Sequence, residues 1–260
     1  MSPHDRRDAA QGAAAHSVAP LATPGFTLQE HGQRGNIPAF CATRGEALAL
    51  ELPGGIDADH VGACLMGFAP LASGAITLFG SDVARAPRER LLQHRRRVAH
   101  APQRPAFLST VTIPDNVAIP LRDRWQLPEQ EVSAAVERKL RALSVTIVGR
   151  VLPSQLAPRA RYLAGLARAL LAAPELLLVA LPDPRLPPQI EEAVRSELMA
   201  AVRDGAALVL IGHGDTRQYC PDATVHTAEA LRDDAAPEDA PRALAGPTPL
   251  AQEGQEDIDT

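Results

Sequence analysis

The stretch from Ala49 to Gly80 has residue types that could hold a phosphate group. An apolar strand is followed by a turn with Gly54 and Gly55, then by a helix, and then by Ser-Gly before a second strand. In such an arrangement the backbone N–H groups at the start of the helix face an anion. The sequence therefore predicts the geometry of a phosphate-binding loop.

The charged residues and cysteines limit the chemistry that is available. Lys139 is the only lysine, so any other cationic contact must come from arginine or protonated histidine. A formal net charge of −5 argues against a nucleic-acid partner, because neutralising phosphates requires a clustered basic surface. Cys41, Cys64 and Cys220 are widely spaced and odd in number, which excludes a disulfide framework and a C-x-x-C metal site. We therefore expect no metal centre.

The longest apolar segment, residues 164–181, is interrupted by Arg168, Pro174 and Glu175. It is therefore not the run of about 18 apolar residues that a membrane-spanning helix needs. The N-terminal residues also lack the apolar core of a secretory signal. We expect a cytoplasmic protein that does not insert into a membrane by itself.

Apolar, strand-like segments alternate with amphipathic helical ones, which is typical of an α/β fold with a mostly parallel sheet flanked by helices. Strands are predicted at Ala47–Glu51, Ala75–Phe79, Val98–Ala101, Glu175–Leu181 and Ala206–Gly212. Helices are predicted at Glu129–Leu143 and Gln189–Asp204, where apolar residues recur on one face. The last two strands are almost continuously apolar, as central parallel strands should be.

Composition divides the chain into three parts. Residues 1–24 lack an apolar period and predict a disordered arm, and residues 229–260 predict an acidic, mostly disordered tail. Residues 25–228 form the predicted folded unit. Within it, residues from about 102 to 160 contain helical patterns but no clear strand, which predicts a protruding helical subdomain.

The region from Gly45 to Asp215 resembles the ATP-binding cassette of ABC transporters. "GFAPLASGAITLFGSDV" is similar to the run after the Walker A helix, and "VAHAPQRPAFLSTVTIPDNVAIPLR" to the Q-loop segment, with Gln103 at the glutamine position. "LPSQLAPRARYLAGLARALLAAPELLLVALPDP" resembles the signature helix and Walker B strand, and "LVLIGHGD" the strand that ends in the H-loop histidine, here His213. The resemblance implies a P-loop NTPase fold with a helical subdomain.

Finer likenesses point to one branch of that family. "NVAIPLRDRWQLPEQ", "VLPSQL" and "PRALAGPTP" look most like the ATP-binding subunit of Mla- or Mce-type phospholipid transport systems. The position of the family's adenine-stacking aromatic has no clear counterpart, and His31 is the nearest candidate.

In that family the Walker A motif G-x-x-x-x-G-K-[ST] places its lysine on the phosphates and its hydroxyl on Mg²⁺. Its eight positions are here Leu52, Pro53, Gly54, Gly55, Ile56, Asp57, Ala58 and Asp59. Ala58 thus replaces the lysine and Asp59 the hydroxyl. Like charges about 4 Å apart cost roughly 4 kcal/mol at an effective dielectric of 20, so Asp57 and Asp59 should repel a nucleotide. We also expect this loop to be exposed and to contribute little to folding.

The other catalytic motifs are altered as well. The Walker B aspartate and glutamate positions are Ala180 and Leu181, which leave neither a metal ligand nor a base. The signature L-S-G-G-Q reads Leu156, Ala157, Pro158, Arg159 and Ala160. Pro158 has no N–H, and Arg159 is bulky where glycine allows close approach.

Gln103 and His213 keep their family identities. For His213 a structural and a catalytic role remain open, and for Gln103 a docking and a chemical one. The segment from Gln103 to Arg122 is rich in apolar residues, and Phe107 and Ile113 are predicted anchors for a permease coupling helix. The alternative is that these residues pack the helical subdomain against the sheet.

The resemblance therefore implies a catalytically defective cassette that binds no cofactor with high affinity, with ATP and Mg²⁺ bound only if the likeness outweighs the motif losses. Three functions remain open. The first is an accessory or structural subunit of an Mla- or Mce-like lipid transport system, docked on a membrane permease or a second ATP-binding cassette. It would then be peripheral at the inner membrane. The others are a weakly active ATPase completed by a partner cassette, and a stand-alone cytoplasmic protein-binding regulator.

Overall fold

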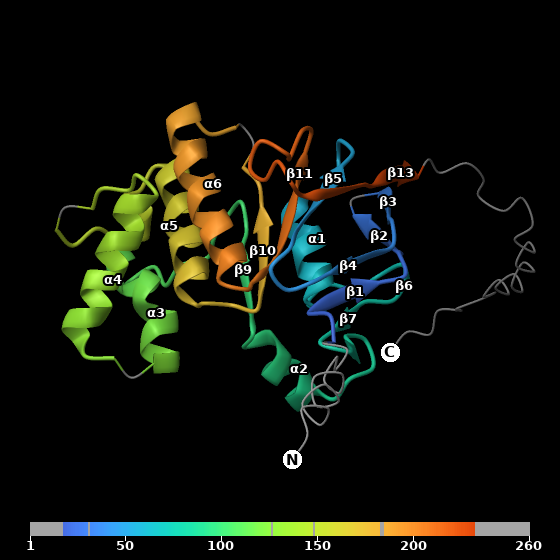
Figure 1. Cartoon of the computed structure of the whole chain (residues 1–260), viewed down its shortest axis with the longest axis horizontal. Coiled ribbons are helices and arrows are strands. Elements are labelled where there is room, and N and C mark those ends of the chain that lie inside the picture. Colours follow the sequence, from blue (N-terminus) through green and yellow to red (C-terminus); the bar gives the residue numbers. More distant parts are fainter. Residues whose placement is uncertain (1–17, 31, 126, 148, 183–184, 232–260) are drawn as a thin grey trace, which may run out of the picture.

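The computed structural model describes residues 18–231, apart from residues 31, 126, 148 and 183–184 (Figure 1). His31, most of the predicted arm and most of the predicted acidic tail therefore lie outside the described residues. In the described part of the chain, every helix is too short or too polar to cross a lipid bilayer.

A five-stranded parallel sheet forms the centre of the fold, in the order β12-β5-β11-β10-β9. Its strands are β5 (Ala47–Leu52), β9 (Val98–Ala101), β10 (Leu176–Ala180), β11 (Ala207–His213) and β12 (Thr224–Thr227). Four of them were predicted from sequence, and each of their ends agrees to within one residue. All five residues of β10 are fully buried, which confirms its central place.

Helices cover both faces of this sheet (Figure 1). Alternate residues of a strand point to opposite faces, so Leu176 and Leu178 pack on α1 (Ala58–Leu65), whereas Leu177 and Val179 face the other side. That other side is covered by α5 (Pro158–Leu171) and α6 (Pro188–Arg203). The predicted α/β fold with a parallel sheet between helices is confirmed.

Two small antiparallel sheets, β4-β1-β7-β8 and β13-β3-β2-β6, contribute to the hydrophobic core around α1. Their strands are β1 (Leu21–Thr23), β2 (Phe26–Glu30), β3 (Gln33–Ile37), β4 (Phe40–Ala42), β6 (Ser73–Gly74), β7 (Thr77–Leu78), β8 (Ser81–Asp82) and β13 (Glu229–Leu231). The strand predicted at Ala75–Phe79 is too long, because only Thr77–Leu78 forms a strand there, β7; β6 precedes the predicted range and belongs to the other small sheet.

Both predicted domain ends need correction. β1 lies inside the predicted arm, where Leu21 is fully buried and pairs with Ala42. β13 lies inside the predicted tail and pairs with β3. Residues 224–231 thus belong to two sheets, because β12 pairs with β5 immediately before β13 pairs with β3. Between them the buried Ala228 donates its N–H to Glu51 O at 2.8 Å.

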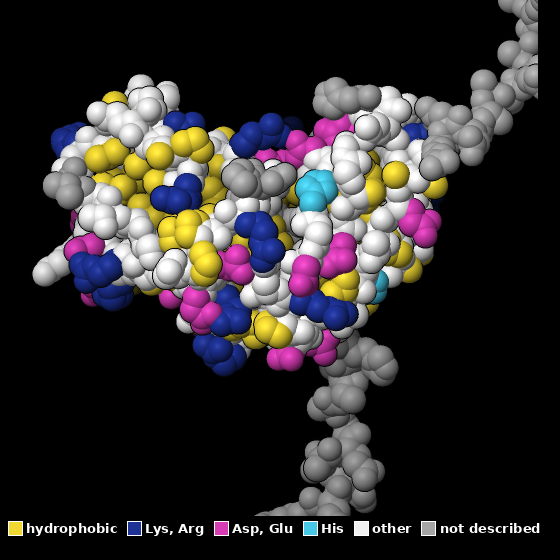
Figure 2. Space-filling model, turned by 90° about the horizontal axis from the view of Figure 1, so that it is seen from above, with side chains coloured by type: hydrophobic (Ala, Val, Ile, Leu, Met, Phe, Trp, Pro, Cys, Tyr) yellow, Lys and Arg dark blue, Asp and Glu magenta, His cyan; other side chains and the backbone are white. Residues whose placement is uncertain are grey.

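The described residues between 102 and 160 contain helices and no strand. They form α3 (Ile113–Trp125), α4 (Glu129–Ala142) and the short turn η2 (Pro153–Gln155), whereas α2 (Arg88–Arg95) precedes β9. The apolar face of α4, with Val132, Val136 and Leu140, joins the same core as α3 and α5. Figure 2 shows hydrophobic side chains gathered over this helical region, whereas charged side chains of both signs are interspersed over the rest of that face.

Candidate functional site

The N-terminus of α1 is capped by a carboxylate of this chain. Asp57 has the extended backbone of an N-cap residue, and its Oδ1 accepts a hydrogen bond from the Asp59 N–H at 2.7 Å. The preceding turn is sharp, with Gly55 at φ 92°, a conformation that favours glycine. A negative charge at this position is stabilised by the helix dipole and by the free N–H groups. The place where a phosphate-binding loop holds its anion thus contains the Asp57 side chain.

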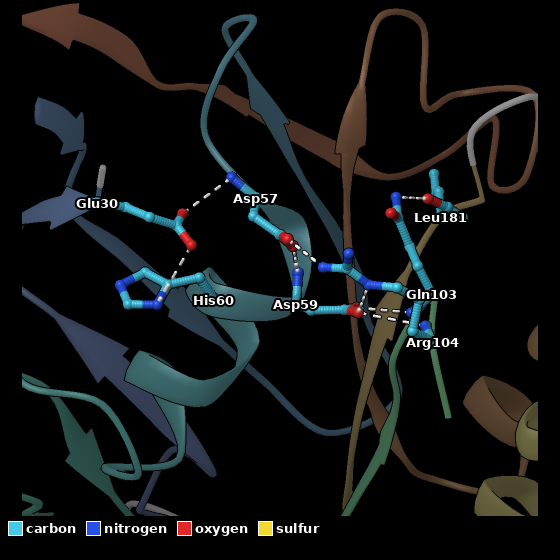
Figure 3. A network of polar contacts seen from close by, with 7 residues as sticks. All are labelled: Glu30, Asp57, Asp59, His60, Gln103, Arg104 and Leu181. Atoms are coloured by element: carbon cyan, nitrogen blue, oxygen red, sulfur yellow. Dashed lines mark hydrogen bonds and ion pairs between the residues drawn. The ribbon is translucent and has the colours of Figure 1, made fainter. Parts of the chain in front are cut away.

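Asp59 ties the same helix to the segment that follows β9 (Figure 3). Its Oδ1 accepts from the Gln103 N–H at 2.6 Å, and its Oδ2 from the Arg104 N–H at 3.2 Å. The Arg104 guanidinium forms an ion pair with Asp57, and its Nε lies 3.6 Å from Asp59 Oδ2. Arg104 therefore offsets part of the negative charge expected to repel a nucleotide.

These contacts contradict the expectation that the loop contributes little to folding. Ile56 and Ala58 are almost fully buried, and the Asp59 side chain is 18% exposed. The Asp57 N–H also donates to Glu30 Oε2 at 3.2 Å, and the other Glu30 oxygen lies 3.8 Å from His60 Nδ1 (Figure 3). The loop is held by β2 on one side and by the residues after β9 on the other. Sequence reasoning missed these links, because each joins residues far apart in the chain.

The residues at the Walker B positions are part of the core. Ala180 is fully buried at the end of β10, and Leu181 is 6% exposed and packs against Gly212. Neither side chain has a polar atom that could bind a metal or accept a proton. The Gln103 side-chain amide donates to the Leu181 carbonyl oxygen, so this glutamine holds the segment after β9 against the end of β10. Among the described residues, no cluster of three or more His, Cys, Asp or Glu side chains is arranged to hold a metal ion.

His213 ends β11 directly beside the start of the loop. It is paired in register with Leu52, and its Nδ1 lies 3.2 Å from the Leu52 carbonyl oxygen. The ring is exposed at the edge of the sheet where the parallel strands end. In open α/β sheets this edge is where ligands bind, so the position agrees with the prediction. The hydrogen bond to Leu52 supports a structural role.

The signature residues form the start of α5. Ala157 is the N-cap residue, but its side chain cannot accept a hydrogen bond, and Pro158 is the first helical residue. Arg161 donates its N–H to Ala157 O at 3.0 Å, whereas no hydrogen bond within the described part of the chain uses the N–H groups of Arg159 or Ala160. Leu156 packs against the core, and Arg159 is exposed.

A cavity of about 680 Å³ joins these two helix starts. Its lining residues are Asp57, Gln103, Arg104, Ala157, Pro158, Arg159, Ala160, Tyr162, Pro182, Arg185 and Leu186. The structure therefore brings the predicted loop, Q-loop and signature positions to one cavity. His213, Ala58, Ala180 and Leu181 do not line it.

Tyr162, Arg185 and Leu186 were not predicted to line a site. The helical spacing from Arg159 to Tyr162 was the one available signal, because residues three apart share a helix face. Tyr162 is 2% exposed, and its hydroxyl has no hydrogen-bond partner among the described residues. Burial raises the pKa of Tyr162 well above its ordinary range, with smaller contributions from Tyr219 and Asp59. The hydroxyl is therefore protonated and able to donate.

The two predicted docking anchors differ in the structure. Ile113 is fully buried in the helical core, so its prediction as an exposed anchor is wrong; the face of α3 that carries it packs inward. Phe107 is half-buried, and the Arg168 guanidinium lies over its ring at 4.8 Å from the centroid. Leu108 and Ile119, at 57% and 39% exposed, are the large apolar side chains that this segment leaves open.

Comparison with known proteins shows which sequences and folds the chain resembles. No family model matches the chain. It is 30% identical over 135 residues to the intermembrane phospholipid transport system ATP-binding protein MlaF of Escherichia coli K12, covering 52% of this chain and 50% of that protein. It is 33% identical over 143 residues to the methionine import ATP-binding protein MetN 2 of Pseudomonas aeruginosa PAO1, covering 55% and 43%. The matches thus span about half or less of these relatives.

Solved structures show the same fold. A dimeric bacterial ABC transporter cassette superposes with a TM-score of 0.66 at 16% identity, covering 82% of this chain and 99% of that one. The cbiO1 protein of Clostridium perfringens, part of an ABC transporter complex, superposes with a TM-score of 0.60 at 16% identity, covering 81% and 87%. The chain therefore has the fold of an ABC ATP-binding cassette and is similar in sequence to the ATP-binding subunits of ABC transporters.

Proposed function

We propose that the chain is a non-hydrolysing accessory or structural subunit of an ABC transport system, docked on a membrane permease or on a second ATP-binding cassette. It would be peripheral at the inner membrane through that partner. The observation that carries the proposal is the content of the phosphate site: Asp57 caps α1 from within, and Asp59 is bound by the N–H groups of Gln103 and Arg104. A nucleotide would have to displace both carboxylates and would find no lysine.

The remaining motifs support the same proposal. Ala180 and Leu181 offer no group for Mg²⁺ or for a water nucleophile. The sole lysine, Lys139, forms an ion pair with Glu197 between α4 and α6. Completion by a partner cassette is the weaker alternative, because both the Walker positions and the signature positions of this chain are altered.

Similarity to MlaF supports phospholipid transport as the finer proposal. The chain also matches a methionine importer in the same identity range. The identity of the permease would separate the two substrates. Co-purification of the full chain from membranes, followed by identification of the bound permease, is the direct test. Recovery of a lipid-transport permease would support the finer proposal, and recovery of an amino-acid permease would overturn it.

Nucleotide binding tests the pseudo-ATPase proposal. We expect the purified chain to bind ATP-Mg²⁺ more weakly than about 1 mM, which corresponds to less than about 4 kcal/mol of binding free energy. Titration calorimetry measures this directly. The triple variant Asp57→Gly, Ala58→Lys, Asp59→Ser restores the loop chemistry and should gain affinity without gaining turnover, because Ala180 and Leu181 are unchanged. Micromolar binding by the natural chain, or turnover by either protein, would contradict the proposal.

A docking test uses the exposed apolar residues before and within α3. Leu108→Ser changes a side chain that is 57% exposed and should leave the melting temperature unchanged while reducing recovery of the permease partner. Leu92→Ser is a matched control on α2, with 49% exposure and no role in the proposed surface. Equal recovery with both variants would reject this surface as the docking site.

A further inference from the structure

The segment that joins β8 to β9 concentrates positive charge. Residues 85–97 contain six arginines and one acidic residue, Glu89, although the chain as a whole carries a net charge of −5. The helix α2 lies within this segment and leads directly into β9, so it lies at the edge where the parallel strands begin (Figure 1). The candidate functional site lies at the opposite edge, and this charge is not part of it.

One face of α2 carries a row of exposed basic and apolar side chains. Arg88, Leu92 and Arg96 follow one another at intervals of four residues, so they lie on the same side of the helix. All three are exposed, with Leu92 at 49%, whereas the neighbouring Leu91 is buried. In the described part of the chain no ion pair involves Arg88. Its charge is therefore available to a partner.

Phe68 adds a large exposed ring beside this row. It is 63% exposed, more than any other large apolar side chain among the described residues. The Arg95 guanidinium lies over the ring at 4.1 Å from its centroid, and also donates to Met66 O at 3.0 Å and to Gly67 O at 2.8 Å. Because Arg95 is three residues beyond Leu92, these contacts hold the ring beside the same face of α2.

This combination of side chains fits the surface of an anionic phospholipid bilayer. Arginines bind the headgroups there, and exposed Phe and Leu side chains enter the boundary between headgroups and acyl chains. At physiological salt, charges separated by more than about 8 Å are largely screened. The local arginines, rather than the net negative charge of the chain, therefore determine the attraction. A free phosphate would contact the arginines alone, whereas a bilayer contacts both kinds of side chain.

We propose that the α2 surface, defined as Phe68, Arg88, Leu92, Arg95 and Arg96, binds the surface of an anionic phospholipid bilayer. The arginines lie among the headgroups, and the two apolar side chains lie below them. Near an anionic leaflet each arginine strengthens binding about fivefold, so a few arginines give a weak and reversible contact. The contact requires neither a nucleotide nor a permease, so it goes beyond the function proposed above.

Sedimentation of the full chain with lipid vesicles tests this contact. We expect binding to phosphatidylcholine vesicles that contain about 40% phosphatidylglycerol, and little binding to phosphatidylcholine alone, because the arginines need anionic headgroups. Binding should weaken several-fold when salt is raised from about 0.05 M to about 0.5 M, because screening shortens the range of the attraction. Equal binding to both kinds of vesicle, or no binding to the anionic ones, would overturn the proposal.

Variants locate the contact on α2. Arg88→Gln and Leu92→Ser should each weaken binding to anionic vesicles by about threefold or more. Both should keep the melting temperature of the natural chain, because the two side chains are exposed. Arg138→Gln on α4 and Leu108→Ser are the matched controls, since both residues are exposed and lie outside the α2 surface. Equal loss in the variants and in their controls would refute the assignment.

The leucine variants also separate this contact from permease docking. Leu92→Ser should weaken vesicle binding and leave recovery of the permease from detergent extracts unchanged, whereas Leu108→Ser should do the reverse. The two proposals can therefore fail independently. If Arg88→Gln weakens vesicle binding and Leu92→Ser does not, the contact is purely ionic. Any acidic partner, including an acidic protein segment, would then satisfy it, and the assignment to a bilayer would be overturned.

Discussion

The starts of α1 and α5 meet at the same cavity but are satisfied in opposite ways. At α1 the chain supplies its own anion, the Asp57 carboxylate, and Asp59 binds two further N–H groups. At α5 the cap residue is Ala157, and the first N–H groups find no side-chain acceptor. A helix start attracts anions in both places, so the residue at the cap decides whether that attraction is used to stabilise the fold.

The largest expected effect comes from removing Asp59. Asp59→Ala should lower the free energy of unfolding by about 2 kcal/mol, because two backbone N–H groups lose a charged acceptor. Urea unfolding measures the loss, with Asp123→Ala, an exposed aspartate on α3, as the control. If both variants lose equally little, the carboxylate at α1 is not the structural link described here.

Removing the cap itself should cost less. Asp57→Ala deletes the acceptor of the Asp59 N–H and one ion-pair partner of Arg104, which is itself 76% exposed. We expect a loss of about 1 kcal/mol, the usual value for an N-cap, since the exposed ion pair adds little. The same urea experiment applies. A loss larger than that of Asp59→Ala would reverse the order of importance of the two carboxylates.

Giving α5 a cap would make the two helix starts alike. Ala157 has the extended backbone of an N-cap, so Ala157→Ser should stabilise the fold by about 0.5 kcal/mol. Ala157→Asp should stabilise it similarly, because a carboxylate can accept from the same N–H groups. Calorimetric unfolding of both variants measures the gain. No gain in either variant would show that the first N–H groups of α5 need no side-chain acceptor.

Mild acid should lower the free energy of unfolding through the buried His100 ring, and neutral pH should leave this contribution unchanged. Burial lowers the pKa of His100, although nearby Asp59 raises it, and Nε2 of this ring has no hydrogen-bond partner in the described part of the chain. Well above about pH 6.5, the ordinary pKa of histidine, the ring is neutral whether the chain is folded or unfolded. Below that value the unfolded chain binds a proton that the folded one resists, so stability falls.

The His100→Leu variant isolates this effect from the carboxylates that also titrate in acid. Its free energy of unfolding should fall less between about pH 6.5 and pH 5 than that of the natural chain. Urea unfolding at several pH values gives the difference. Parallel curves for the two proteins would show that the buried ring is not the source of acid sensitivity.

Sequence patterns predicted the central sheet well and the small sheets poorly, for a physical reason. β10 and β11 are continuous apolar runs buried on both faces, so their composition alone indicates them. β1 and β13 have three residues each, too few for a period, and pair with strands distant in sequence. The strand predicted at Ala75–Phe79 was too long because only Thr77 and Leu78 pair with neighbouring strands.

For the candidate site, too, local sequence order was informative and contacts between distant segments were not predictable. The order of residues placed Asp57 and Asp59 at the start of α1, which the structure confirms. It could not show that Arg104 lies against them, because that contact depends on how the segment after β9 packs beside α1. Ile113 was misjudged because the sequence does not distinguish an apolar residue that faces the core from one that faces a partner. The missing partner of Tyr162 is likewise visible only in three dimensions.

Residues 224–231 also couple the opening of the parallel sheet to the opening of the antiparallel sheet β13-β3-β2-β6. Because one uninterrupted segment is the edge strand of the parallel sheet and then of an antiparallel sheet, neither sheet can lose this edge without loosening the other. Amide hydrogens in β12 and β13 should therefore exchange with solvent in a single opening event, with a shared protection factor. The most C-terminal described residues thus hold together two sheets that are formed by earlier parts of the chain.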